Sequence, residues 1–325
     1  MRRREFISLL GAAASWPAAL RAQPLKIVGL VSPGSRPALE LDAPNLLAFR
    51  NGLRESGVDV DRSVRLDVRW AAGDMPLARR HLSEMIEAGA SVLVTPSFPI
   101  SQAAAELTRS VPIVTISSDP VGTGLVASLS KPAGNVTGLS YMTPELNSKR
   151  LDLLKEAVPG LRRVAVLLNR KNGHEELGLA QMRAAAKTLG LELVLVEVET
   201  ADRLESAFAR MEADKPGALF PFANPVTATH FRRMIDFANR IGLPTMFELT
   251  DFTGSGALMA YGPSYRELFT RAGVIAGRLL RGSMPADLPI EQPRTFELSI
   301  NLKTAKALGL TFSPSFLIRA DEVIE

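Results

Sequence analysis

The chain has 325 residues, 46% of them hydrophobic and 22% charged, which is the composition of a folded, water-soluble protein with room for two domains. The absence of cysteine excludes disulfides, thiolate nucleophiles, zinc fingers and iron–sulfur clusters, and the wide spacing of His81, His174 and His230 argues against a multi-histidine metal site. The formal charge of +4 comes mainly from four arginines in the first 22 residues, so the nearly neutral remainder lacks the positive field of a nucleic-acid binder.

The N-terminus has the pattern of an export signal. Residues 3–7 (RREFI) fit the twin-arginine motif, and the apolar stretch 7–20 is shorter than the roughly 20 residues that span a bilayer. We expect cleavage after Ala22, although Leu20 replaces the small residue usual three positions before the cut. An amphipathic N-terminal helix that stays attached is the alternative.

From residue 25 onward, short β-rich runs alternate with helical patterns, as in parallel sheets built from βαβ units. Strands are expected at 26–31, 64–70, 91–95 and 112–117. Apolar residues at spacings of three and four predict helices between them, one through Leu46, Phe49 and Leu53 and one from Ala78 to Ile86.

A second series follows a break rich in turn-forming residues at 134–141. A helix is expected from Thr143, and further strands and helices alternate after it. The expected strands are 163–168, 192–198, 218–220, 245–247, 257–261 and 296–302, and the expected helices are 176–189, 204–213, 227–241, a segment ending at 280, and 303–308. The fold class is therefore α/β, with two open sheets and a ligand crevice between the carboxyl ends of their strands.

The sequence holds none of the common catalytic or cofactor motifs. No G-x-G-x-x-G follows the first strand, where residues 29–34 read GLVSPG, and neither a G-x-x-x-x-G-K-S/T loop nor a G-x-S-x-G elbow occurs. His174 opens a segment like a zinc-protease helix, but no second histidine follows four residues later. We therefore expect no cofactor and no metal, while an enzyme is not excluded.

Polar residues recur at the ends of the expected strands. Hydroxyl and amide donors beside a helix N-terminus can hold a carboxylate, and an opposing carboxylate can hold an ammonium. Each residue taken alone is also a common helix N-cap, so only the recurrence points to a ligand. The candidate ligand-binding residues are Ser32, Ser97, Phe98, Ser117, Ser118, Asp119, Ser140, Tyr141, Asn169, Asn224, Glu248 and Asp251.

Several longer motifs resemble one family. They are 119–129 (DPVGTGLVASL), 131–140 (KPAGNVTGLS), 256–263 (GALMAYGP) and 318–325 (IRADEVIE), with further matches at 144–151 and 285–310. Together these runs closely resemble the fingerprint of the tryptophan/tyrosine-binding-like substrate-binding proteins of ATP-binding-cassette (ABC) importers, a branch of the type I periplasmic binding proteins. The resemblance covers nearly all of the chain after the export signal.

The resemblance implies two Rossmann-like lobes with a central ligand cleft and three hinge crossings, near 140–143, 254–256 and 285–289. The first lobe would comprise 24–141 and 256–286, and the second 142–255 and 287–325. Seven of the candidate residues match pocket positions of the family: Ser97, Ser118, Asp119, Ser140, Asn169, Asn224 and Asp251. Relatives proposed to take amino acids tend to have an acidic residue before the position of Asn224, where this chain has Ala223, which argues against an amino-acid ligand.

The function implied by the resemblance is solute capture in the periplasm, without catalysis, followed by delivery to an ABC permease in the inner membrane. The ligand would be a small molecule, amino-acid-like or aromatic, and we expect a monomer with no nucleic-acid partner. Two other interpretations remain open. One is a periplasmic ligand sensor of the same fold. The other is an exported α/β enzyme that uses Asp119 or Glu248 as a general base.

Overall fold

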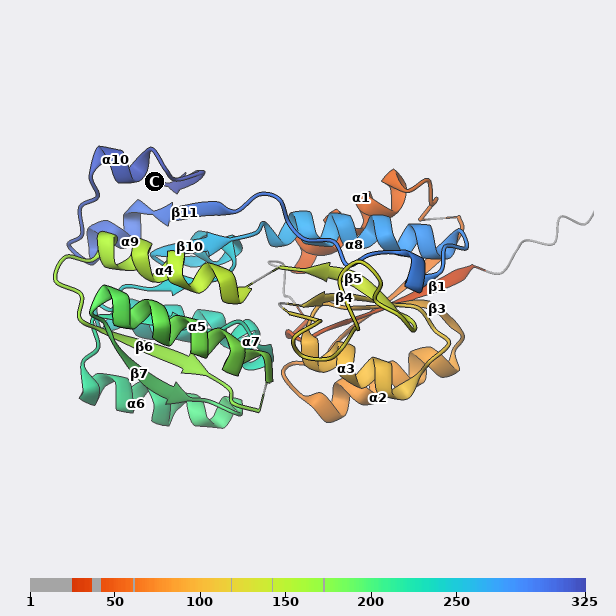
Figure 1. The fold of residues 1–325 in the computed structure, drawn as a ribbon, viewed down its shortest axis with the longest axis horizontal. Coiled ribbons are helices and arrows are strands. Elements are labelled where there is room, and N and C mark those ends of the chain that lie inside the picture. Colours follow the sequence, from red (N-terminus) through yellow and green to blue (C-terminus); the bar gives the residue numbers. More distant parts are fainter. Residues whose placement is uncertain (1–24, 37–41, 61, 118, 142, 172) are drawn as a thin grey trace, which may run out of the picture.

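The structure is a computed structural model that describes residues 25–36, 42–60, 62–117, 119–141, 143–171 and 173–325. The expected export signal and Ser118 lie outside these residues. Figure 1 shows two lobes side by side, each a sheet covered by helices. No helix within the described ranges is long and apolar enough to cross a membrane.

The first lobe is built on a five-stranded parallel sheet in the order β2-β1-β3-β4-β5. Its strands are β1 (Lys26–Ser32), β2 (Val64–Trp70), β3 (Ala90–Thr95), β4 (Ile113–Ser117) and β5 (Val136–Ser140). All residues of β4 and β5 are buried, as in a parallel sheet with helices on both faces. The expected strands of this lobe are confirmed, but β5 was not expected, because Gly138 and the preceding Gly134 suggested a turn.

Helices cover both faces of the first sheet (Figure 1). On one face α1 (Asp42–Glu55) and α8 (Tyr265–Leu280) pack on β1, β3, β4 and β5, and on the other lie α2 (Met75–Glu87) and α3 (Phe98–Leu107). The α1 and α8 backbones approach so closely that a Cβ on Gly52 would stand 1.9 Å from the carbonyl oxygen of Thr270. A helix from late in the chain thus completes the first lobe.

The second lobe contains a parallel sheet β7-β6-β8 and a mixed sheet β12-β11-β10-β9, joined by a bridge between Leu219 and Thr245. The strands are β6 (Arg163–Leu168), β7 (Glu192–Glu197), β8 (Ala218–Pro221), β9 (Met246–Phe247), β10 (Met259–Gly262), β11 (Glu297–Asn301) and β12 (Glu322–Ile324). Among the described strands of this lobe, β10 and β11 pair antiparallel, and the other pairings are parallel. The expected strands of this series are confirmed, and β12 is an addition.

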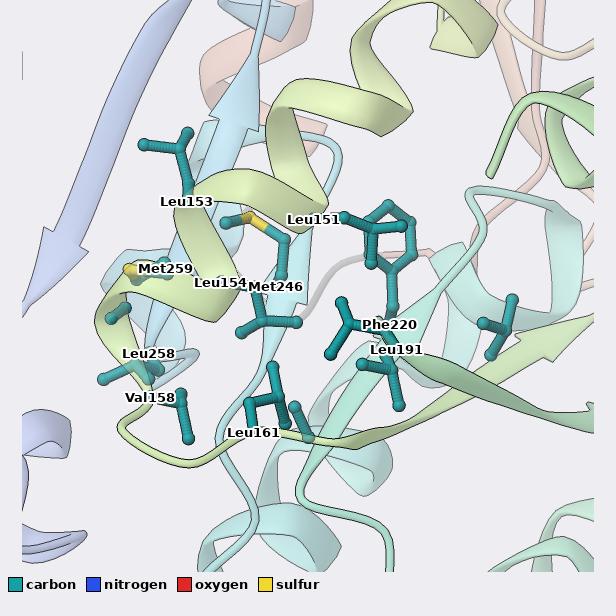
Figure 2. Packing of buried hydrophobic residues seen from close by; sticks show 14 of the residues in the cluster. Leu151, Leu153, Leu154, Val158, Leu161, Leu191, Phe220, Met246, Leu258 and Met259 are labelled. Atoms are coloured by element: carbon teal, nitrogen blue, oxygen red, sulfur yellow. The ribbon is translucent and has the colours of Figure 1, made fainter. Parts of the chain in front are cut away.

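Helices also cover both faces of the second lobe. The long ones are α4 (Thr143–Ala157) and α5 (Gly173–Leu189) on one face, and α6 (Leu204–Asp214) and α7 (Pro225–Arg240) on the other. The short helices of this lobe are η1 (Ala201–Arg203), η2 (Thr250–Ser255), α9 (Leu302–Ala307) and α10 (Pro314–Leu317), while η3 (Pro285–Asp287) lies against β5 of the first lobe. Figure 2 shows leucines of α4 packed against Phe220 and Met246 from the strands.

Three segments connect the lobes. The first follows Ser140 and leads into α4. The second joins Gly262, the last residue of β10, to Tyr265 at the start of α8, and the third runs from Glu291 to β11. Glu291 still belongs to the first lobe, because its N–H donates to the carbonyl of Gly138 at 2.9 Å.

The second and third crossings lie later in the chain than expected. Residues 256–261 were assigned to the first lobe, yet β10 pairs with β9 and β11 of the second. Residues 287–291 were assigned to the second lobe, yet the Ile290 N–H donates to the carbonyl of Leu129 at 2.7 Å. The boundaries differ because an apolar strand buried on both faces carries no pattern that tells which sheet it joins.

Candidate functional site

Three of the candidate serines are the last residues of strands in the first sheet. Ser32 ends β1, Ser117 ends β4 and Ser140 ends β5, and the register pairs Ser117 with Ser140. All three are buried. Because parallel strands present their carboxyl ends at one edge of the sheet, these residues lie along the edge where open α/β folds bind ligands.

Behind this edge, buried hydroxyl groups satisfy one another. Ser101 Oγ lies 2.8 Å from Thr95 Oγ1 and 2.6 Å from Thr115 Oγ1, which links α3, β3 and β4. The hydroxyl groups of Ser97 and Ser117, in contrast, have no hydrogen-bond partner among the described residues, although both oxygen atoms are buried. A buried hydroxyl without a partner is unfavourable, so these two are the donors that a ligand can complete.

Ser97 is also the N-cap residue of α3, and its side chain makes no capping hydrogen bond. The next residue, Phe98, is half-buried at the first turn of that helix. Tyr141, directly after β5, is half-buried, and its N–H donates to the carbonyl of Ser117 at 3.0 Å. The N-terminus of α3 thus combines an unused hydroxyl and a helix dipole that favours negative charge with aromatic side chains at the same edge.

Asp119 has a local role. Its Oδ1 accepts a hydrogen bond from the N–H of Gly122 at 2.8 Å, and its carbonyl accepts one from the hydroxyl of Thr123 at 2.6 Å. These bonds shape the turn that follows β4. A carboxylate held in this way is engaged before any ligand binds, which weakens its candidacy as a general base.

The two candidate asparagines of the second lobe are held by the backbone around them. Asn169 Oδ1 accepts from the N–H of Lys171 at 3.0 Å, and its Nδ2 donates to the carbonyl of Glu199 at 3.3 Å. Asn224 caps α7, its Oδ1 accepting from Val226 N at 2.9 Å and Thr227 N at 3.0 Å. Both therefore have the N-cap or turn role that competes with ligand contact at such positions.

Glu248 follows β9 directly and is 3% exposed. Its carboxylate Oε2 lies 3.9 Å from Nη1 of Arg150, a fully buried arginine of α4, and its carbonyl lies 3.5 Å from Nη2 of the same guanidinium. Gly262 keeps the space for this approach, because a Cβ there would stand 2.0 Å from the Glu248 carbonyl oxygen. The carboxylate is thus paired with a cation.

Asp251 lies in a different charged environment. Burial raises the pKa of its carboxyl group, Arg266 opposes that shift, and Glu322 of β12 adds to it. The pKa of Glu297 is also raised, first by burial and then by neighbouring carboxylates that include Asp251. Asp251 therefore belongs to an acidic group beside the second and third crossings, with residues from β11 and β12.

One contact joins the lobes across their strand ends. The hydroxyl of Thr229, in the first turns of α7, donates to the carbonyl of Pro33 after β1 at 3.2 Å. The helical geometry of α7 breaks at the next residue, His230 (φ −112°, ψ 19°), whose pKa is lowered by burial and then by Arg233. This contact is not predictable from the sequence, because it depends on how the lobes meet.

Arg150 is the second residue that the sequence did not single out. The available signal was its position in the buried stripe of α4, three residues after Asn147 and four before Leu154. A basic residue in such a stripe needs a partner.

The arrangement suits binding better than metal chemistry. Among the described residues, no group of three or more His, Asp or Glu side chains could hold a metal ion. The strand ends provide neutral hydroxyl groups from the first lobe, and amide and carboxylate groups from the second. This set can hold the polar end of a small molecule by hydrogen bonds.

Comparisons with known proteins agree with this geometry. The family described as ABC transporter substrate binding protein matches residues 37–324. The tyrosine-binding protein of Clostridioides difficile (strain R20291) is 28% identical over 264 residues, which cover 81% of this chain and 75% of that protein.

Two solved structures resemble the whole two-lobed body. The ABC domain in complex with L-Trp from Streptococcus pneumonia is 25% identical, with a TM-score of 0.83 over 92% of this chain and 100% of that one. The ligand-free, open structure of a substrate binding protein with adhesive properties from Clostridium difficile is 24% identical, with a TM-score of 0.63 over 92% of this chain and 99% of that one. The strand-end site and the match over nearly the full length identify the chain as a member of the ABC transporter substrate binding protein family.

Proposed function

We propose that this chain is the solute-binding component of an ABC importer, which captures a small molecule between its two lobes and delivers it unchanged to a permease in the inner membrane. The observation that carries the proposal is the pair of buried hydroxyl groups on Ser97 and Ser117, which have no partner among the described residues. Both lie at the strand-end edge of the first lobe, where a solute would complete their hydrogen bonds.

The lobe arrangement supports a closed, ligand-holding form. The L-Trp complex and the open structure have nearly the same identity to this chain and cover the same share of it, yet their TM-scores are 0.83 and 0.63. The hydrogen bond from Thr229 to Pro33 also joins the two lobes, at their strand ends. A solute that touches both lobes favours this form, because it binds the closed state better than the open one.

The ligand class that fits best is a small aromatic molecule with a carboxylate. The unused hydroxyl of Ser97 lies at the N-terminus of α3, where the helix dipole favours a negative charge. Phe98, the first residue of α3, supplies aromatic surface at the same helix end. The named ligands of the relatives, tyrosine and L-Trp, are of this class. Ala223 provides no carboxylate to pair with an amine, so the ligand does not have to carry one.

The site of action follows from the N-terminal sequence. Residues 1–22 fit a twin-arginine export signal, and we propose that the mature chain acts as a monomer in the periplasm. Mass spectrometry of the secreted protein, with cleavage after Ala22 and a monomeric mass, would support this. A cytoplasmic protein that retains Arg3 and Arg4 would contradict it.

The binding function is tested by calorimetry with L-tryptophan, L-tyrosine and indole-3-propionate, and by native mass spectrometry of the freshly purified protein. We expect Ser117→Ala to weaken binding while leaving the melting temperature nearly unchanged. The control Ser101→Ala removes a partnered hydroxyl group and should lower stability instead. A wild-type protein that binds no small molecule would contradict the proposal. A protein that chemically alters the molecule it binds would contradict it as well. Loss of uptake of the identified solute on gene deletion distinguishes import from sensing.

A further inference from the structure

Arg150 is the largest fully buried side chain among the described residues, with 0% exposure. An arginine is rarely buried in this way, because removing its charge from water is unfavourable unless partners surround it. It lies in α4, shortly after the first crossing, and contacts Glu248, one of the candidate ligand-binding residues.

The contacts of the guanidinium reach three separate segments. Nε donates to the carbonyl of Tyr261 at 2.6 Å, and Nη1 donates to Asn147 Oδ1 at 2.9 Å. Nη1 also lies 3.9 Å from Oε2 of Glu248. Asn147 is itself fixed, because its Nδ2 donates to the carbonyl of Gly178 at 3.2 Å. The planar fork of an arginine suits such a divided set of partners, whereas a lysine has only one nitrogen.

These partners lie where the lobes connect. Tyr261 is the penultimate residue of β10, just before the second crossing, and Asn147 follows the first. Glu248 follows the carboxyl end of β9. Asn169 and Asn224 likewise follow the carboxyl ends of β6 and β8. One side chain therefore joins Glu248 to residues beside the first and second crossings.

We propose that Arg150 is a positioning residue of the ligand site, which pairs with the Glu248 carboxylate and fixes it at the end of β9 as an acceptor for a hydrogen bond from the solute. This inference rests on the proposed function. Arg150 acts through Glu248 and, being fully buried behind it, does not itself hold the solute.

The charged and titratable groups around the guanidinium influence the pKa of Arg150. Burial lowers the pKa of Arg150, whereas Glu248, Tyr141 and Tyr261 act in the opposite direction. An arginine keeps its proton at neutral pH. Removing the guanidinium would therefore leave the Glu248 carboxylate buried without its cation.

The test compares ligand-free wild type, Arg150→Gln, Arg150→Lys and the double variant Arg150→Gln/Glu248→Gln by urea unfolding at pH 5 and pH 8. Without its cation, the buried carboxyl group takes up a proton, so Arg150→Gln should lose about tenfold more in its folded-to-unfolded ratio at pH 8 than at pH 5. Arg150→Lys and the double variant should show the same pH dependence as the wild type. If Arg150→Gln does not fold, the double variant should restore folding.

Binding of L-tryptophan as a probe completes the test at pH 7. Arg150→Gln should lose about tenfold in affinity, which corresponds to one missing hydrogen bond, and Arg150→Lys should lose less. A loss of stability in Arg150→Gln that is independent of pH and is not reversed by Glu248→Gln would overturn the assignment, whether or not a solute binds. Unchanged probe affinity in Glu248→Gln would overturn it as well. A wild type that binds no solute contradicts the proposed function, and the unfolding measurements then decide the role of Arg150.

Discussion

Thr229 of the second lobe donates its hydroxyl hydrogen to the carbonyl oxygen of Pro33 in the first, at 3.2 Å. The two residues come from α7 and from the segment after β1, which lie about 200 positions apart in the chain. Because this bond exists only when the lobes meet, it contributes to the stability of the closed form and to none of the interactions within a lobe.

The first prediction concerns the balance between open and closed forms. Thr229→Val keeps the shape of the side chain and removes the bond, so the ratio of closed to open molecules should fall about fivefold without ligand. The chain has no cysteine, so spin labels can be attached at exposed positions through Arg80→Cys and Ala209→Cys. The distance distribution between the labels should shift to longer values.

A matched control is Thr270→Val on α8. Its hydroxyl group donates to the carbonyl of Arg266 within the same helix at 3.2 Å, so its loss should leave the distribution between the lobes unchanged. Equal distributions for Thr229→Val and Thr270→Val would show that the contact with Pro33 does not hold the lobes together.

The second prediction assigns Asn224 to the structure of α7. Asn224→Ala removes a cap that accepts two backbone hydrogen bonds, and the free energy of unfolding should fall by about 1 kcal/mol. Asn224→Ser can still cap the helix and should retain most of the stability. Urea unfolding of both variants gives the comparison. An alanine variant as stable as the wild type, but with weaker solute binding, would assign Asn224 to the ligand instead.

The third prediction uses the crowded end of β10. A Cβ at residue 262 would stand 2.0 Å from the Glu248 carbonyl oxygen, so Gly262→Ala should cost more than about 1–3 kcal/mol or prevent folding. The control is Gly254→Ala, where nothing lies within 4 Å of the added atom. The measurement is the melting temperature of each variant. Melting temperatures within a degree of each other would contradict the close approach of Gly262 to the Glu248 carbonyl.

The fourth prediction concerns pH. The pKa of Asp251 is raised, chiefly by burial, so its contribution to stability is complete below the ordinary aspartate pKa and is lost as the pH rises through the raised value. Asp251→Asn should therefore gain stability relative to the wild type between about pH 4 and pH 7. Asp287→Asn, which changes an exposed carboxylate, serves as the control. A stability difference that is constant with pH would contradict the raised pKa.

The sequence predicted the repeated βαβ units well, because buried parallel strands are short apolar runs between periodic helices. The bounds of β2 and β6 match those expected. Strand β5 was missed because Gly134 and Gly138 suggested a turn, and β12 because three residues carry too little pattern. The second and third crossings were placed early, since the run around Met259 is apolar on both faces and does not reveal its sheet.

The candidate site was only partly predictable. Strand-end positions made Ser97 and Ser117 candidates, but the sequence does not reveal that their hydroxyl groups lack partners while Ser101 is bonded to Thr95 and Thr115. Which polar residue is left for a ligand is thus decided by packing between strands and α3. The pairing of Arg150 with Glu248 is equally non-local, because it joins residues nearly 100 positions apart.

The central claim, that a solute is held between the two lobes, is tested most directly by a crystal structure of the protein with the small molecule that it carries when purified. The molecule should lie between the hydroxyl groups of Ser97 and Ser117 and the end of β9 at Glu248, chemically intact. Density for that molecule on an outer surface of either lobe, with these hydroxyl groups still unbonded, would contradict the account.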